Sequence, residues 1–237
     1  MISVVIPAYN EEQTVGDVVR GIHGAFGKIA GWGEPFEVLV VDSGSTDATA
    51  RLSEKAGAIV LRRPHEGKGQ AVRAGLASAR GDVIVLMDSD GQDLPSELPV
   101  LVKAFRTSGA DFVNGSRFLG TFRAEGITPI DRYGNRALTM LANLLVGSHL
   151  SDINASYRVI RRSAIAGIPW RCREFEVECE MILKASRAGL QILEVPVTRE
   201  RRLGGVRKFR KVRQGLRILG MILHTGLLWR PPTFAKN

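Results

Sequence analysis

Short apolar runs alternate with longer amphipathic stretches over residues 1–116. The short runs are rich in Val and Ile, which favour β-strands, and each is followed by a polar or glycine-bearing turn. In the longer stretches, apolar residues recur at the spacing of one helix face, as at Val15, Val18, Val19 and Ile22. The predicted strands are residues 3–6, 37–42, 58–63, 82–87 and 111–116. Because strands that alternate with helices form a parallel sheet, the pattern predicts an α/β fold with a Rossmann-like, mostly parallel sheet flanked by helices.

Beyond residue 117 the pattern becomes mixed. Helices are predicted at 132–147 and 174–189, and strands at 155–160 and 191–197. No repeat, low-complexity tract or linker divides the chain, so we expect one domain over residues 1–205 and a basic, amphipathic helical extension over 206–237. The apolar run within that extension is shorter than the roughly 20 residues that a membrane-spanning helix needs.

Polar residues are concentrated in the loops that follow the predicted strands. In an open parallel sheet these loops lie beyond the carboxyl ends of the strands, which is where ligands bind. The loop sequences are PAYNEE, DSGSTD, RPHEGKG, DSDGQD and GSRF. We therefore expect the ligand site along this edge of the sheet, which we call the rim.

The acidic loop DSDGQD follows the most apolar of these strands. Asp88 and Asp90 are separated by one residue, and two carboxylates so close together repel each other unless a cation lies between them. Oxygen ligands at this spacing suit Mg²⁺ or Mn²⁺, and Gln92 supplies a further neutral oxygen. The loop therefore predicts a metal that neutralises a nucleotide diphosphate. The alternative is an exposed acidic turn that caps a helix starting at Ser96.

Composition limits the class of protein. The 237 residues are 44% hydrophobic, which suits one globular domain with a full core. No Lys or Arg precedes the brief apolar run that ends at Pro7, so neither a signal peptide nor a membrane anchor is predicted and a cytoplasmic protein is expected. Cys172 and Cys179 have no histidine nearby and are interpreted as ordinary thiols. The four histidines show no ligand spacing and are assigned no role.

The net charge of +9 is concentrated in one segment. Between Arg199 and Arg217 nine basic residues stand against one acid, Glu200. Such a charge suggests nucleic acid, an anionic membrane surface or a phosphorylated substrate as partner. Because the segment has no interleaved stacking aromatic apart from Phe209 and no recognition motif is present, nucleic acid is the least favoured partner.

Six segments of the chain, taken in order, resemble family 2 glycosyltransferases of the GT-A fold. They are VVIPAYNEE, VVDSGSTDAT, HEGKGQAVRAG, MDSDGQDLP, GSRF and EVPV. The acidic segment is similar to that of the polyprenyl-phosphate hexosyltransferases, typified by dolichol-phosphate mannose synthase. The resemblance implies an inverting transfer of mannose or glucose from GDP-mannose, UDP-glucose or another nucleotide sugar to a polyprenyl phosphate. A soluble phosphorylated acceptor, such as a phosphoglycerate, is the alternative.

The resemblance also assigns residues to the donor. Those expected to contact the nucleotide sugar are Pro7, Tyr9, Glu11, Asp42, Lys68, Asp88, Arg202 and Lys208. Those expected to hold Mg²⁺ or Mn²⁺ are Asp88, Asp90 and Gln92. Asp42 also ends the second predicted strand, which independently places it on the rim. Lys68 is either a donor contact or a solvated lysine at the start of a helix.

The chemistry of the acceptor requires no strong base. A lipid monophosphate has a second pKa near 6, so much of it is dianionic at neutral pH and can itself attack the anomeric carbon. The reaction needs a metal at the leaving diphosphate and cations at the incoming phosphate. Asp90, through the metal, and the acceptor-phosphate candidates Arg117 and Arg132 are therefore the predicted catalytic residues. The alternatives are a salt bridge across the rim for Arg117 and a solvated helix position for Arg132.

Two predictions concern helices near the basic segment. A helix through Glu176 and Glu178 would direct only one of these acids toward the site; the alternative is that both are surface acids. A helix at the C-terminal end would place basic residues among anionic lipid headgroups and dip Leu219, Ile222, Leu223 and Leu227 beneath them. The alternative is that Ile218, Met221, Ile222 and Leu228 pack as core or against a membrane-embedded partner subunit.

Overall fold

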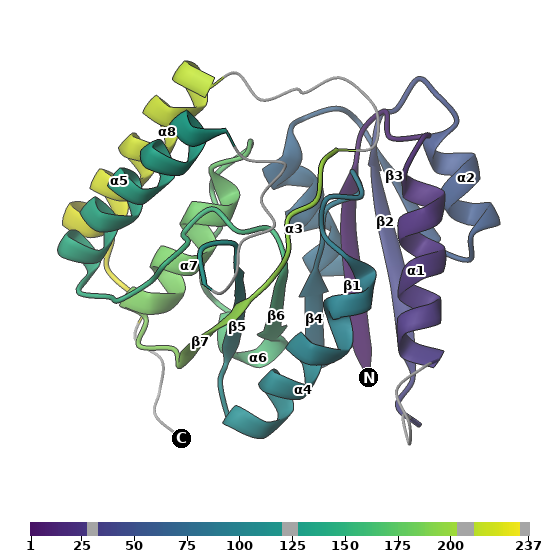
Figure 1. Cartoon of the computed structure of the whole chain (residues 1–237), viewed down its shortest axis with the longest axis horizontal. Coiled ribbons are helices and arrows are strands. Elements are labelled where there is room, and N and C mark those ends of the chain that lie inside the picture. The colour runs from purple at the N-terminus through teal and green to yellow at the C-terminus, as the bar shows by residue number, and fades with distance from the viewer. Residues whose placement is uncertain (28–32, 120–127, 203–210, 233–237) are drawn as a thin grey trace.

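A seven-stranded sheet forms the centre of the computed structural model, which describes residues 1–27, 33–119, 128–202 and 211–232 (Figure 1). The strands are β1 Ile2–Ala8, β2 Phe36–Ser43, β3 Ile59–Arg63, β4 Val83–Leu86, β5 Phe112–Ser116, β6 Arg158–Arg161 and β7 Ile192–Pro196. Their order is β3-β2-β1-β4-β6-β5-β7, and β6 runs antiparallel to both of its neighbours. All seven strands were predicted from the sequence, and the mostly parallel sheet is confirmed.

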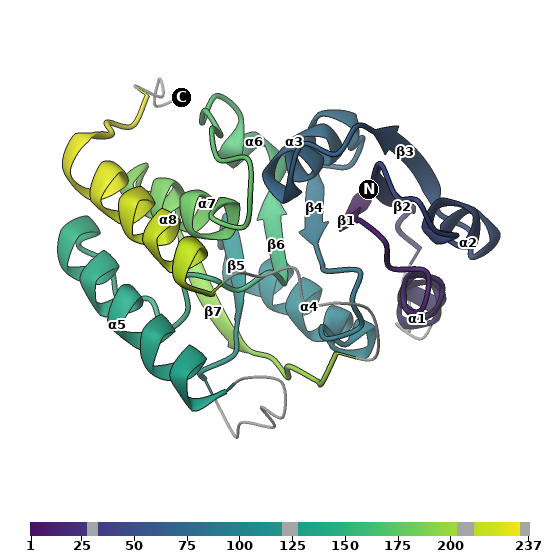
Figure 2. The same ribbon diagram turned by 90° about the horizontal axis from the view of Figure 1, so that it is seen from above.

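Helices cover both faces of the sheet (Figure 2). They are α1 Val15–Gly27, α2 Thr49–Lys55, α3 Lys68–Ser78, α4 Leu98–Ser108, α5 Pro129–Val146, α6 Arg162–Ile165, α7 Val177–Arg187 and α8 Lys211–Leu223, with short turns η1 Pro95–Glu97 and η2 His224–Leu228. One apolar core lies between the sheet and the side chains of α1 and α4. A second core lies between the opposite face and α3, α5, α7 and α8. The fold is therefore a three-layer α/β/α arrangement.

The start of α7 differs from the sequence prediction, which began this helix at residue 174. The helix begins at Val177, and the amide of Val177 donates to the carbonyl of Glu174 at 3.2 Å. The amide of Gly69 donates to the carbonyl of Arg173 at 2.7 Å, and the amide of Cys172 donates to the Glu180 carboxylate at 2.9 Å. These tertiary bonds anchor the chain just before residue 174.

The C-terminal helix α8 packs beside α5, and both helices run in the same direction (Figures 1 and 2). Gly226, just past α8, lies against Leu145 near the end of α5. Ile218 and Ile222 are buried in the second core, whereas Leu223, Leu227 and Leu228 are exposed. The expectation that Ile222 faces a membrane was therefore wrong, and so was the alternative that Leu228 packs as core. No helix in the described ranges is long and apolar enough to cross a membrane.

Candidate active site

The acidic loop after β4 is folded so that its carboxylates lie together. The amide of Gln92 donates to Asp90 Oδ1 at 3.1 Å, and the amide of Asp88 donates to Asp93 Oδ2 at 3.2 Å. Gly91, with φ of 74°, adopts the left-handed conformation that closes this turn. Asp90 and Asp93 are buried, so the loop gathers negative charge away from water.

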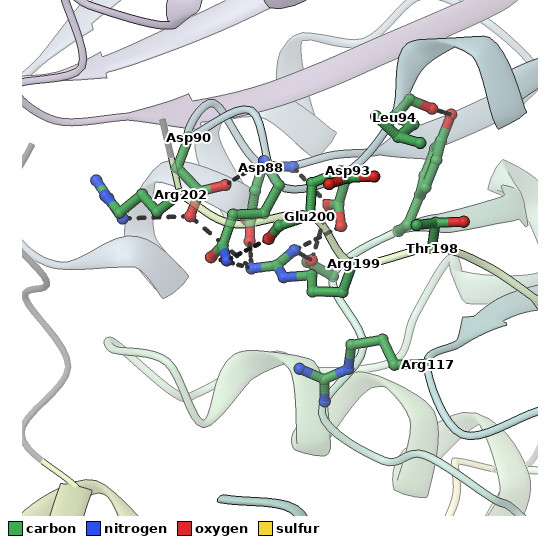
Figure 3. A network of polar contacts seen from close by, with 12 residues as sticks. Asp88, Asp90, Asp93, Leu94, Arg117, Thr198, Arg199, Glu200 and Arg202 are labelled. Carbon is green, nitrogen blue, oxygen red and sulfur yellow. Dashed lines mark hydrogen bonds and ion pairs between the residues drawn. The ribbon is translucent and has the colours of Figure 1, made fainter. Parts of the chain in front are cut away.

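Arg199 inserts its guanidinium into this cluster (Figure 3). Its Nη1 lies 2.5 Å from Asp93 Oδ1, and its Nη2 lies 3.3 Å from Asp88 Oδ2 and 3.8 Å from Asp90 Oδ2. The same Nη2 donates to Gln92 Oε1 at 3.1 Å. Burial would lower the pKa of Arg199, but the surrounding carboxylates outweigh it and raise the pKa further above its usual range.

Arg202 contacts the opposite side of the loop. Its Nη1 lies 3.2 Å from Asp90 Oδ2, and its Nη2 pairs with Glu11 from the loop after β1. The predicted donor residues Glu11 and Arg202 thus lie beside Asp90. Lys208, the other predicted cation of this segment, lies outside the described residues.

The oxygen atoms around Arg199 fit a divalent cation. Oxygens of Asp88, Asp90 and Gln92 lie between 3.1 and 3.8 Å from one positively charged nitrogen, Arg199 Nη2. Carboxylate and amide oxygens are the ligands that Mg²⁺ and Mn²⁺ prefer. Within the described residues, no group of three or more His, Cys, Asp or Glu side chains is arranged to hold a metal. Gln92 and oxygens from a bound ligand would have to complete the shell.

Lys68 and Glu178 form a buried ionic chain with Asp88. Lys68 Nζ lies 2.5 Å from Asp88 Oδ1 and also pairs with Glu178. Burial would raise the pKa of Asp88, but the charges of Lys68 and Arg199 hold it well below its usual range. By contrast, burial raises the pKa of Asp90 to about 6, because Asp88 and Asp93 offset the attraction of Arg199. Lys68 is therefore not the solvated lysine that was one of its two interpretations.

Tyr9 and His65 form a stacked pair at the β1–β3 side of the rim. Their ring centroids are 3.9 Å apart with an interplanar angle of 23°. His65 Nδ1 lies 3.2 Å from the carbonyl oxygen of Ser43, so the ring is oriented by the end of β2. Asp42, the neighbour of Ser43 in β2, is buried, and its Oδ1 accepts a hydrogen bond from the amide of Ser45 at 3.1 Å. Ser43, rather than Asp42, lines the cavity described below.

Arg117 is held by Asp152 at the other side of the rim. Arg117 Nε and Nη2 donate to the two Asp152 oxygens at 2.6 and 2.8 Å, and Asn135 donates to the same carboxylate at 3.1 Å. Burial would raise the pKa of Asp152, but Arg117 lowers it below its usual value. The predicted salt-bridge alternative for Arg117 is therefore present, although Arg117 still lines the cavity. Arg132 is exposed on α5 and does not line it.

A cavity of about 630 Å³ connects these groups. Its polar lining comes from the rim and includes Tyr9, Asp88, Asp90, Gln92, Arg117, Arg199 and Arg202. Its apolar lining includes Phe118, Ile130, Leu138, Phe175 and Ile218. Because Ile130 and Leu138 belong to α5 and Ile218 to α8, the cavity extends from the strand ends to the paired helices. One continuous site therefore offers both oxygen ligands and an apolar surface.

Sequence reasoning missed four residues that shape this site: Asp93, Asp152, Glu178 as the partner of Lys68, and Arg199. Glu178 was one of two acids left open; Glu176 instead accepts from Gln214 at 3.0 Å. Arg199 was counted only as part of the basic segment. His65 was given no role, although its place in a rim loop was a usable signal.

Comparisons with known proteins agree with this geometry. A model of the family described as glycosyl transferase family 2 matches residues 3–168. A low-salt glycan biosynthesis hexosyltransferase of Haloferax volcanii is 33% identical over 204 residues, which are 86% of this chain and 48% of that protein. A dolichyl-phosphate hexose transferase of the same organism is 32% identical over 86% of this chain and 84% of its own. The chain thus spans about half the length of the first relative.

Among solved structures, a glucosyl-3-phosphoglycerate synthase from Mycobacterium tuberculosis superposes with a TM-score of 0.73 and 25% identity. The match covers 95% of this chain and 80% of that one, which was crystallised with Mn²⁺, uridine diphosphate and glucosyl-3-phosphoglycerate. The sheet order and the acidic loop at its rim agree with the family match. Because that match covers residues 3–168, the chain belongs to glycosyl transferase family 2.

Proposed function

We propose that the protein is an inverting, metal-dependent glycosyltransferase that moves a hexose from a nucleotide diphosphate sugar to a polyprenyl phosphate. The observation that carries the proposal is the cavity that joins the acidic loop to an apolar lining between α5 and α8. A sugar diphosphate needs the first of these surfaces and a hydrocarbon chain needs the second. The relative named as a dolichyl-phosphate hexose transferase supports a hexose as the transferred group and a polyprenyl phosphate as the acceptor.

At the donor side, Asp88, Asp90 and Gln92 would hold Mg²⁺ or Mn²⁺. When bound, the ion supplies positive charge at the leaving diphosphate. Tyr9 and His65 offer stacked rings against which a nucleotide base can lie, and Ser43 and Asp42 stand next to them. These residues suit UDP-glucose or GDP-mannose equally. The structural neighbour crystallised with Mn²⁺ and uridine diphosphate supports a uridine nucleotide.

At the acceptor side, Arg117 is the cation that lines the cavity, and Asp152 holds its guanidinium in a two-point contact. A phosphate dianion next to Arg117 would be oriented without being protonated, so its oxygen can attack the anomeric carbon directly. Arg132 lies one turn along α5 from the lining residue Asn135, nearer the start of the helix, and would attract the phosphate from outside. No side chain has to act as a base.

The second candidate acceptor is a soluble phosphorylated acid such as a phosphoglycerate. The observation that favours it is the fold shared with glucosyl-3-phosphoglycerate synthase. The rim would serve both acceptors, because both present a phosphate. The apolar lining from α5 and α8 has no use in the second reaction, so we favour the lipid.

We further propose that α5 and α8 dock the protein peripherally on the cytoplasmic face of an anionic membrane. Their outward apolar side chains are between 40% and 80% exposed: Ile130, Tyr133, Met140 and Leu144 on α5, and Leu216, Leu223, Leu227 and Leu228 on α8 and η2. The basic residues of the two helices are Arg132 and Arg136 on α5 and Lys211, Arg213 and Arg217 on α8, against one acid, Asp131. A second copy of the chain would bring these cations against each other, whereas anionic lipid complements them at about 1 kcal/mol per residue.

Vesicle flotation tests the docking surface. The protein is expected to float with vesicles that contain anionic lipid, less so as salt rises, and not with neutral vesicles. Met140→Asp with Leu223→Asp should abolish flotation, whereas Val100→Asp, an exposed apolar position on α4, should not. Failure of the unaltered protein to float at low salt would remove the membrane from the proposal and favour either a membrane-embedded partner subunit or the soluble acceptor.

A substrate screen tests the reaction. The protein is incubated with UDP-glucose or GDP-mannose and either a polyprenyl phosphate or 3-phosphoglycerate, with Mn²⁺, Mg²⁺ or EDTA. With a donor whose sugar is radiolabelled, we expect label in the butanol extract of the reactions that contain polyprenyl phosphate. No label should be extracted when EDTA is present. Label only in phosphoglycerate would select the second candidate, and no transfer from any donor would contradict both.

A further inference from the structure

Arg199 occupies the position at which the proposed metal ligands converge (Figure 3). Its Nη2 has Gln92 Oε1 at 3.1 Å, Asp88 Oδ2 at 3.3 Å and Asp90 Oδ2 at 3.8 Å. A divalent ion bound by these oxygens would lie about as close to the guanidinium as the oxygens do. Two cations at that distance in a buried site repel each other strongly. The metal and Arg199 therefore cannot share this position.

The backbone around Arg199 is fixed to the acidic loop. The amide of Glu200 donates to the carbonyl of Gln92 at 3.0 Å, and Gln92 Nε2 donates to the carbonyl of Glu200 at 2.9 Å. One residue earlier, the amide of Thr198 donates to the Glu97 carboxylate at 3.0 and 3.1 Å. Because these bonds do not involve the guanidinium, the side chain of Arg199 can leave the carboxylates while the backbone stays in place.

The charges of the cluster favour such an exchange. Among the described residues, the carboxylates in its ion pairs are those of Glu11, Asp88, Asp90, Asp93 and Glu178, and the cations that pair with them are Lys68, Arg199 and Arg202. A divalent ion would supply to Asp88 and Asp90 the positive charge that the guanidinium supplies without it. A nucleotide diphosphate then brings negative charge of its own, which gives a displaced guanidinium a new partner.

We propose that Arg199 is a built-in competitor of the divalent metal. Without donor, its guanidinium neutralises Asp88 and Asp90 and holds the ligands in place; when the metal binds, the guanidinium moves to the diphosphate. The inference rests on the metal site of the proposed function. It follows that metal alone binds weakly, and that metal and nucleotide strengthen each other's binding by the same factor.

Mn²⁺ titration followed by electron paramagnetic resonance tests this exchange. The proteins compared are the unaltered chain, Arg199→Gln, Arg199→Lys and Arg106→Gln, each with and without uridine diphosphate and with no sugar or acceptor. Without nucleotide, Arg199→Gln should bind Mn²⁺ about tenfold more tightly and should gain less from the nucleotide. Arg199→Lys keeps the charge, and Arg106 on α4 lies in an exposed ion pair with Glu34, so both variants should behave as the unaltered chain.

Thermal unfolding separates this role from a purely structural one. In EDTA, Arg199→Gln should melt at a lower temperature than the unaltered chain, because its carboxylates face each other without a cation. Added Mn²⁺ should restore more of the melting temperature in the variant, since tighter binding stabilises the folded state further. Equal or weaker Mn²⁺ binding by Arg199→Gln would overturn the inference. Since the assay involves no transfer, failure of the proposed reaction would be seen separately, in the substrate screen.

Discussion

Removal of the Lys68 ammonium should destabilise the fold far more than removal of an ordinary surface charge. Its side chain is 14% exposed, and those of its partners Asp88 and Glu178 are 15% and 11% exposed. In Lys68→Met, Asp88 keeps Arg199 as a partner, but Glu178 loses the one cation that an ion pair gives it among the described residues. Loss of one partner from a buried pair costs about 3–5 kcal/mol, and we expect about 3 kcal/mol here because Asp88 remains paired.

Urea unfolding measures this cost. With an m value of about 3 kcal/mol/M, a loss of about 3 kcal/mol lowers the midpoint by about 1 M. Lys103→Met, at an exposed lysine of α4, is the matched control and should change stability by less than about 0.5 kcal/mol.

The double variant Lys68→Met with Glu178→Gln isolates the reason. If the cost comes from an unpaired buried carboxylate, neutralising Glu178 should return at least about 1 kcal/mol, so the two changes are not additive. A single-variant cost below about 1 kcal/mol, or a double-variant cost equal to the sum of the two, would refute the reasoning. In that case the ionic chain would be open to water and of little energetic weight.

Three further changes test the site. Asp90→Ala, or excess EDTA, should remove most sugar transfer while far-ultraviolet circular dichroism stays unchanged; undiminished turnover would argue against the metal. Asp42→Ala should weaken donor binding more than acceptor binding. Calorimetry that shows an unchanged affinity of the variant for the preferred nucleoside diphosphate would contradict a contact between Asp42 and the nucleotide. Asp152, whose pKa is lowered by Arg117 against the opposing effect of burial, stabilises the fold above an unfolded pKa of about 3.9, and this contribution disappears as pH falls through the lower folded value. Asp152→Asn should therefore be less stable at neutral pH and lose less stability between pH 5 and 3; identical acid profiles would show that the pair is not coupled to folding.

The order of strands and helices could be predicted because it depends on local chemistry. Val and Ile runs such as 83–86 favour strands, and apolar residues at helix spacing, as at Val15 and Val18, bury one side of a helix. The rim residues followed from the same pattern, since parallel strands bring their carboxyl ends to one edge. Asp88, Asp90 and Gln92 were therefore identified as possible ligands before any contact was known, and the structure brings their oxygens together.

The start of α7 could not be predicted in this way. Local propensity continues the helix back to residue 174, whereas in the structure Gly69 and Glu180 bind the backbone of Arg173 and Cys172, just before that position. Likewise, the pattern of α8 allowed either side to be the buried one. Contact with α5 and α7 decided that Ile218 and Ile222 form core while Leu223 and Leu227 stay exposed.

The role of Arg199 was decided by tertiary structure alone. Arg199 stands 106 residues from Asp93 along the chain and looked like any other member of a basic run. Its role arises because the chain that leaves β7 crosses the acidic loop and pairs with it at Asp93. The sequence shows which side chains carry a charge. Which opposite charge each of them meets depends on how distant segments cross in the fold, and burial then strengthens that ion pair.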